Sequence, residues 1–231
     1  MKRFYREVTV EQLERGFAVR LDGRHIKTAA GVPQIVPSRA LAAALAAEWD
    51  EQGEDLDPGR FHFRDLADYA IDIVGPDRGT ALNKLLAFAE TDTLCYRADP
   101  EEALYRRQLE VWEPLLAAFE SAENVRFERV SGIIHRSQPP QTLAALRARL
   151  AALDNFTLAG LQTCASLAAS LCIAMAVLQP DAEVEALWNA ANLEELWQAE
   201  LWGHDAEAQT RLALRTLEFR RGAEFLRLVS N

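Results

Sequence analysis

Two adjacent carboxylates, Glu194 and Glu195, lie in a helical stretch that also carries tryptophans. Residues three, four and seven apart share one face of a helix. The spacing therefore places Glu195 on a stripe with Trp188, Gln198 and Trp202. A carboxylate among large apolar rings must be hydrogen-bonded, be protonated, or meet a partner group from elsewhere.

Three interpretations of this pair stay open. A carboxylate with a raised pKa could act as a general acid or base. Alternatively, Glu194 is solvated and Glu195 is a satisfied structural group. In the third interpretation the acid recognises an Arg or a backbone amide of a protein partner. No companion catalytic group accompanies the pair, which favours structure or recognition over catalysis.

The sequence around this stretch carries negative charges only. No Lys or Arg occurs between Arg149 and Arg211, whereas nine Asp and Glu residues do. Such a region is either neutralised by cations that the fold brings from elsewhere, or offered to a basic partner.

Two further places carry candidate groups. Asp92 and Arg97 flank a change from helix to strand, where the simplest expectation is an ion pair across the turn. Trp49 lies in an alanine-rich helix, so its ring is either a core residue or an exposed anchor for a partner.

Other chemistry finds little support. His25, His62, His135 and His204 are scattered, and the cysteines lack metal-type spacing, so we expect no metal site. No phosphate-binding glycine motif and no nucleophile motif occurs. The sequence therefore predicts no cofactor.

Composition narrows the class of protein. The chain has 231 residues, a net charge of −10, a pI near 5.0 and 49% hydrophobic residues, as in a soluble globular protein. Nucleic acid and anionic membranes are poor partners for this charge. The uncharged residues 156–178 are long enough for a membrane span but are better explained as a buried helix, so we expect no membrane insertion. The three cysteines are Cys95, Cys164 and Cys172. Cys164 and Cys172 lie in an apolar, helix-like run and are expected to be buried, reduced thiols, which indicates a reducing compartment.

The pattern of elements predicts an α+β fold. Residues 6–10, 17–21 and 24–28 should form strands, with an Asp22-Gly23 hairpin turn and a short edge strand at 34–37. Ser38 should cap a helix over 39–52. We place the domain boundary near residue 60, between a small β-rich domain with one helix (1–60) and a larger, mainly α-helical domain (61–231). Helices are expected over 63–74, 79–90, 100–121, 139–153, 156–178, 181–202 and 205–221, with β-like pieces at 93–97 and 125–135 that could pair with each other or with the first domain.

Taken together, the motifs resemble the ATP-twelve family, the assembly chaperones of the catalytic sector of the F-type ATP synthase. The markers are Lys2-Arg3-Phe4-Tyr5, Leu21-Asp22-Gly23-Arg24 with Lys27-Thr28, Glu48-Trp49, Thr91-Asp92-Thr93-Leu94 with Tyr96-Arg97, Gln108 with Trp112 and Pro114, and Leu193-Glu194-Glu195 with Gln198, Trp202 and Gly203. They cover nearly the whole chain.

The resemblance implies a two-domain chaperone without catalysis. Its expected partner is the free α subunit of the ATP synthase, held until the β subunit replaces it. The expected partner-binding residues are Glu194, Glu195, Gln198, Trp202, Trp49, Asp92 and Arg97.

The first residues show no presequence of the kind that mitochondrial relatives, which act in the matrix, carry. We therefore expect a bacterial, cytoplasmic protein, with the mature form of an imported protein as the alternative. A monomer is expected, because a chaperone of this kind must present its surface to the client. Two rival hypotheses stay open. One is a generic interaction module with another client. The other is a hydrolase that uses Glu194 or Glu195 with Asp92.

Overall fold

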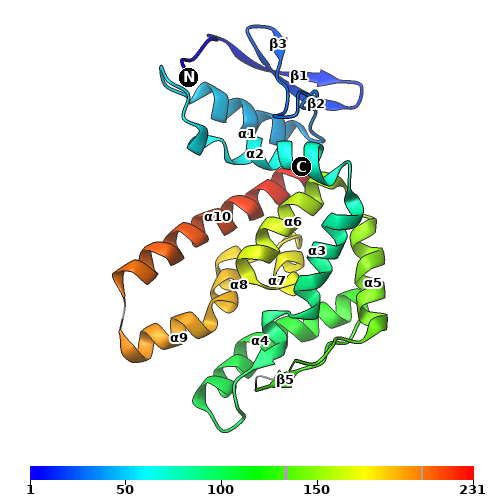
Figure 1. The fold of residues 1–231 in the computed structure, drawn as a ribbon, viewed down its shortest axis with the longest axis vertical. Coiled ribbons are helices and arrows are strands. Elements are labelled where there is room, and N and C mark those ends of the chain that lie inside the picture. The colour runs from blue at the N-terminus through cyan, green and yellow to red at the C-terminus, as the bar shows by residue number, and fades with distance from the viewer. Residues whose placement is uncertain (133–134, 204) are drawn as a thin grey trace. The chain divides into compact units, whose positions relative to one another are not determined.

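The computed structural model describes residues 1–132, 135–203 and 205–231 (Figure 1). Three short strands precede a mainly helical chain, as the sequence predicts. The elements are β1 (Val8–Leu13), β2 (Gly16–Leu21), β3 (Arg24–His25), α1 (Arg39–Asp50), η1 (Pro58–Arg60), α2 (His62–Tyr69), η2 (Ala70–Val74), α3 (Arg78–Glu90), η3 (Thr93–Cys95), β4 (Tyr96–Arg97), α4 (Ala103–Glu123), β5 (Val130–Ser131), α5 (Pro140–Ala151), α6 (Asn155–Ala168), α7 (Leu171–Ala176), α8 (Val184–Ala191), α9 (Leu193–Trp202) and α10 (Ala206–Ser230).

The described chain forms two compact units. The N-terminal unit comprises residues 1–81, 154–160 and 224–231, and the helical unit comprises 82–153 and 161–223. The N-terminal unit thus recruits two distant segments that local sequence patterns do not mark. The division into domains at residue 60 stays a prediction.

An antiparallel sheet in the order β1-β2-β3 begins the N-terminal unit. Asp22 and Gly23 both have positive φ, at 47° and 78°, and turn β2 into β3. This confirms the predicted hairpin, because such turns favour Asp-Gly. The expected edge strand at 34–37 is wrong: only an isolated bridge between Phe17 and Val36 forms there.

Helix α1 packs against this sheet around a shared apolar core. Its N-terminus is capped as predicted, since the Ser38 hydroxyl oxygen accepts from the backbone N–H of Leu41 at 3.0 Å. Ser38 also donates to the carbonyl of Leu228, which fixes the end of the chain to this unit. Residues that form the buried core include Val19, Leu21, Val36, Leu41, Leu45, Phe225 and Leu228.

In the helical unit, Trp112 on α4 is fully buried, and its indole N–H donates to the Ala190 carbonyl of α8 at 2.8 Å. The two β-like pieces pair with each other, because Tyr96 lies opposite Val130 in a short parallel ladder. Residues 133–134, within the second predicted piece, lie outside the described residues.

The long helix expected at 156–178 is interrupted. Ala169 takes a left-handed conformation with φ of 48°, and Ser170 caps the new helix α7 by accepting from the Ile173 N–H at 3.0 Å. No helix in the described part of the chain is long and apolar enough to cross a bilayer.

Cys164 and Cys172 are free and buried, as predicted, and Cys95 is free and buried as well. Burial raises the pKa of Cys164 to about 12, so this thiol is unreactive near neutral pH.

Candidate functional site

Three of the predicted site residues line one groove between α9 and α10 in the helical unit. The groove has a volume of about 640 Å³, and Glu195, Gln198 and Trp202 contribute to it from α9. Figure 1 shows α9 and α10 as consecutive helices of the chain. Opposite them on α10 lie Ala208, Gln209, Leu212, Ala213, Thr216 and Arg220.

Local capping fixes where these helices begin and end. The helix expected over 181–202 is broken at Asn192, whose side-chain amide donates to the Trp188 carbonyl at 2.8 Å. Gly203 ends α9 with a φ of 85°, a conformation that glycine adopts without steric cost. Asp205 then caps α10, since its carboxylate accepts from the Ala208 N–H at 2.8 Å. His204 lies outside the described residues.

Several large apolar side chains of α9 and α10 are exposed to solvent. Trp202 is 78% exposed and its neighbour Leu201 is 56% exposed. On α10, Leu214 and Leu217 are exposed as well. An exposed indole beside an apolar hollow is typical of a protein-binding surface, where tryptophan is enriched among energetically important contacts.

Glu195 reaches a cation that the sequence around it lacks. Its Oε2 atom accepts from Nη1 of Arg215 at 3.2 Å, and both side chains are 42% exposed. The guanidinium of Arg215 also lies 5.3 Å from the centre of the Trp188 ring. The carboxylate is therefore hydrogen-bonded, as its position required, but through a half-exposed pair that contributes only about 0–1 kcal/mol. A partner can compete for such a pair at small cost.

Glu194 turns away from the groove. Its Oε1 atom accepts from the side-chain amide of Gln108 at 2.7 Å, and Gln108 in turn accepts from the Ala98 N–H. Partial burial raises the pKa of Glu194, and the hydrogen bond from Gln108 opposes that rise. The two adjacent acids thus have separate environments, and Glu194 does not line the groove.

Asp92 and Arg97 do not form the expected ion pair. Asp92 is fully buried and accepts from the N–H groups of Leu94 and Cys172 and from the Ser170 hydroxyl. Burial raises the pKa of Asp92, although these hydrogen bonds act to lower it. Arg97 is also buried and pairs with Glu113 instead.

These bonds tie the turn after α3 to the start of α7, so Asp92 and Arg97 support the helical unit from inside. Neither side chain lines the α9–α10 groove. The geometry required by the hydrolase hypothesis is absent from the described residues, because Asp92 does not converge with Glu194 or Glu195 on one cleft.

Trp49 belongs to the N-terminal unit, separate from the groove. Its ring packs at 4.6 Å from Phe61 and at 5.6 Å from Tyr5, measured between ring centres. Trp49 is partly buried against the core, so it is neither a fully buried core residue nor a fully exposed anchor.

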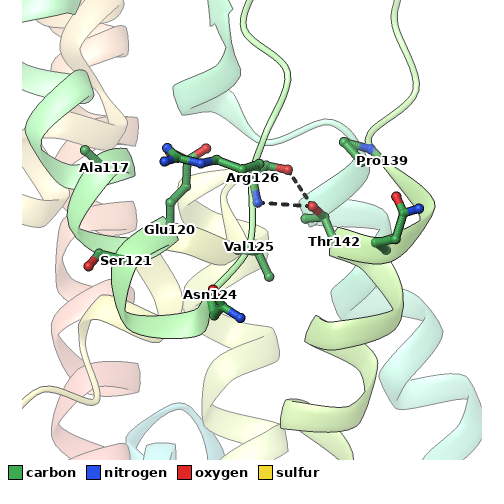
Figure 2. Close-up of a pocket in the computed structure, with 9 residues that line it drawn as sticks. Ala117, Glu120, Ser121, Asn124, Val125, Arg126, Pro139 and Thr142 are labelled. Atoms are coloured by element: carbon green, nitrogen blue, oxygen red, sulfur yellow. Dashed lines mark hydrogen bonds and ion pairs between the residues drawn. The ribbon is translucent and has the colours of Figure 1, made fainter.

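A second cleft in the helical unit, of about 680 Å³, lies between α4 and α5 (Figure 2). Its charged groups already have partners: the carboxylate of Glu120 is bonded by Arg126 at 3.0 Å and by Arg129. Burial pushes the pKa of Glu120 up, but the bonds from Arg129, the Phe127 N–H and Arg126 outweigh it and lower the pKa. This cleft is therefore less suited to capture a charged partner than the α9–α10 groove.

The contribution of α10 to the site was missed from the sequence. Arg215 pairs with Glu195 at 3.2 Å. Arg220 pairs with Glu185 through two hydrogen bonds, one to each carboxylate oxygen. A signal was present, because a stretch without Lys or Arg is followed by a helix that carries Arg211, Arg215, Arg220 and Arg221.

No group of three metal-ligating side chains occurs within residues 1–132, 135–203 and 205–231.

Comparisons with known proteins agree with each other. A family model described as ATP12 chaperone protein matches residues 2–120. The mitochondrial protein atp12 of Schizosaccharomyces pombe is 26% identical over 214 residues, which are 87% of this chain and 74% of that protein.

Solved structures are similar over almost the full length. The crystal structure of Atp12 from Paracoccus denitrificans matches with a TM-score of 0.93 and 34% identity, covering 99% of this chain and 98% of that one. A putative chaperone from Agrobacterium tumefaciens matches with a TM-score of 0.92 and 38% identity, covering 98% and 85%.

Proposed function

The chain belongs to the ATP12 chaperone family, and on this premise we propose that it binds the free α subunit of the F-type ATP synthase. The family acts in assembly of the ATP synthase and its members are chaperones, not enzymes. In the proposed role the chain prevents aggregation of the α subunit until the β subunit replaces it.

The observation that supports this proposal is the α9–α10 groove, which is lined by the exposed Trp202 and by Glu195, whose carboxylate pairs with Arg215. The groove joins an apolar surface to a charge pair that is weak enough to rearrange. We propose Trp202 and Gln198 as direct contacts and Glu195 as the group that meets a cation of the client.

The remaining predicted residues have other roles in this proposal. Glu194 orients α9 through Gln108, and Asp92 and Arg97 hold the helical unit together. Trp49 anchors the N-terminus of the chain to α1 through the Tyr5 hydroxyl, which donates to the Trp49 carbonyl at 2.6 Å.

A free subunit exposes apolar and edge surfaces that its neighbour covers after assembly, and these surfaces promote aggregation. A chaperone that works without ATP must cover them and still yield to the true partner. A moderate interface with one aromatic anchor and a polar rim meets both demands, because its affinity stays below that of an obligate subunit contact.

The test measures light scattering of isolated α subunit as it aggregates, with and without the chain and without nucleotide. The proposal expects suppression at stoichiometric amounts of chain and co-elution of the two proteins. Absence of suppression and of co-elution would contradict it. Co-purification of a different client from the native cell would favour the generic interaction module instead.

The compartment and oligomeric state follow as parts of the same proposal. We place the protein in the bacterial cytoplasm, where the α subunit is synthesised, and expect a monomer that leaves its groove free for the client.

A further inference from the structure

We propose that the N-terminal unit carries a second binding surface, which takes an acidic, apolar peptide segment of a partner protein. The surface is a hollow of about 540 Å³ near the start of the chain, lined among others by Phe4, Tyr5, Arg24, Lys27 and Trp49. Three of the sequence motifs that the α9–α10 groove does not use meet in this hollow: residues 2–5, residues 21–28, and the pair 48–49.

Aromatic rings form the apolar part of the hollow. Tyr5 packs edge-to-face against Trp49 and against Phe4, with ring centres 5.6 and 5.3 Å apart. Tyr5 is buried, whereas Phe4 is 63% exposed. Phe4 therefore offers an aromatic face that the fold does not cover, on a base held in place by its neighbours.

The charged part of the hollow is positive. Arg24 and Lys27 are exposed, and neither has an ion-pair partner among the described residues. Asp22 also lines the hollow: its carboxylate accepts from the N–H groups of Arg6 and Glu7 at 3.0 and 2.9 Å and interacts with the charge of Arg24, so Arg24 and Lys27 together outweigh it. These backbone bonds lower the pKa of Asp22.

This local charge is opposite to that of the whole protein. The first 27 residues contain seven Lys and Arg against four Asp and Glu, in a chain with a net charge of −10. An anionic segment is therefore attracted to this surface and repelled by most of the rest, which favours one docking position.

The mixture of cations and rings favours a peptide over nucleic acid. A phosphate backbone is bound through a row of several Lys and Arg contacts, whereas this hollow offers two exposed cations beside an aromatic wall. An acidic residue next to a large apolar one matches both features.

The test uses fluorescence anisotropy with the full chain and a short dye-labelled peptide of alternating glutamate with leucine or phenylalanine. Two comparators carry the same dye: the peptide with lysine in place of glutamate, and a single-stranded oligodeoxynucleotide. The proposal expects saturable binding of the acidic peptide alone, weakening as salt is added. Equal binding of the oligodeoxynucleotide, or of the lysine peptide, would overturn it.

Two charge-reversed variants locate the site. Arg24→Glu with Lys27→Glu should weaken peptide binding about tenfold or more, whereas Arg15→Glu with Arg39→Glu, which changes the net charge equally at exposed sites, should change it by less than about twofold. Phe4→Ala should also weaken it, with an unchanged melting temperature. An equal loss in both charge-reversed variants would overturn the assignment to this hollow.

Two more readouts separate the alternatives. Trp202→Ala, in the α9–α10 groove, should leave binding of the acidic peptide intact. Loss of α subunit binding at the groove can therefore be told apart from loss of peptide binding at the hollow. Sedimentation velocity tests for self-association: a dimer that Arg24→Glu with Lys27→Glu dissolves would show that the occupant is a second copy of the chain, and would overturn the proposed partner.

Discussion

Arg215 of α10 donates to Glu195 of α9 at 3.2 Å, and Glu195 also lines the groove between these two helices. The acid that stands out in the sequence is thus held by a cation twenty positions further along the chain. Because both side chains are 42% exposed, this pair positions α9 and α10 without contributing much to the free energy of folding. The arrangement keeps a carboxylate available beside the apolar residues of the groove.

Replacing Trp202 tests the apolar rim. Trp202→Ala should weaken binding of the α subunit by about 2 kcal/mol, the cost of truncating a typical aromatic anchor, and leave the melting temperature almost unchanged because the ring is 78% exposed. Titration calorimetry measures the loss. Ile73→Ala, at a 53% exposed apolar residue of the N-terminal unit, is the matched control and should bind normally.

Reversing the charge at Glu195 tests the charged part of the groove. In Glu195→Lys the new ammonium faces the Arg215 guanidinium, so α subunit binding should fall about tenfold, while folding stability changes by less than about 1 kcal/mol. Glu200→Lys makes the same change in net charge on an exposed position of α9 outside the groove. If both variants lost affinity equally, the effect would come from overall charge and the specific role of Glu195 would be refuted.

The buried ion network around Glu120 predicts acid sensitivity of the helical unit. The pKa of Glu120 is lowered from its ordinary value of 4.5, so its contribution to stability is present above that value and is lost as the pH falls through the lower folded-state pKa. Glu120→Gln should cost about 3 kcal/mol at neutral pH, because Arg129 loses a charged partner, and should flatten the acid limb of the stability curve.

Urea unfolding at several pH values measures this difference. Glu207→Gln, in an exposed pair with Arg211, is the control and should follow the unmodified protein. If the free energy of unfolding of Glu120→Gln fell with decreasing pH as steeply as that of the unmodified protein, the network would not control acid unfolding.

Gly16 is required by both conformation and space. It has a φ of 141°, and a Cβ atom there would lie 2.4 Å from the carbonyl oxygen of Val36. Gly16→Ala should therefore destabilise the protein by about 2 kcal/mol or more. Gly31→Ala is a matched control, with a φ of 82° but no atom within 4 Å of the new Cβ, and should cost about 1 kcal/mol. Thermal unfolding by circular dichroism compares them, and equal losses would mean that backbone strain alone matters.

Elements with strong local signals could be predicted from the sequence. The Asp22-Gly23 turn and the Ser38 cap each use chemistry that lies within a few residues, and both form as expected. The groove residues on α9 were also identified, because helical spacing brings Glu195, Gln198 and Trp202 to one face.

The breaks in the predicted helices depend on tertiary contacts that the spacing of residues in the sequence does not reveal. The break at Ala169 is fixed by the Thr93 N–H, which donates to the Ala169 carbonyl at 3.0 Å, and by Asp92, which binds the Ser170 hydroxyl and the Cys172 N–H. These partners lie more than seventy residues away in the sequence. Helical periodicity continues across Ala169 and Asn192, so it favours uninterrupted helices at both places.

Hydrogen exchange of the chain with and without the α subunit tests the central claim most directly. The account predicts new protection of backbone amides in residues 195–203 and 205–216, which form the α9–α10 groove, and no such protection with Trp202→Ala. Protection confined to other segments, with these residues exchanging as fast as in the free chain, would contradict it.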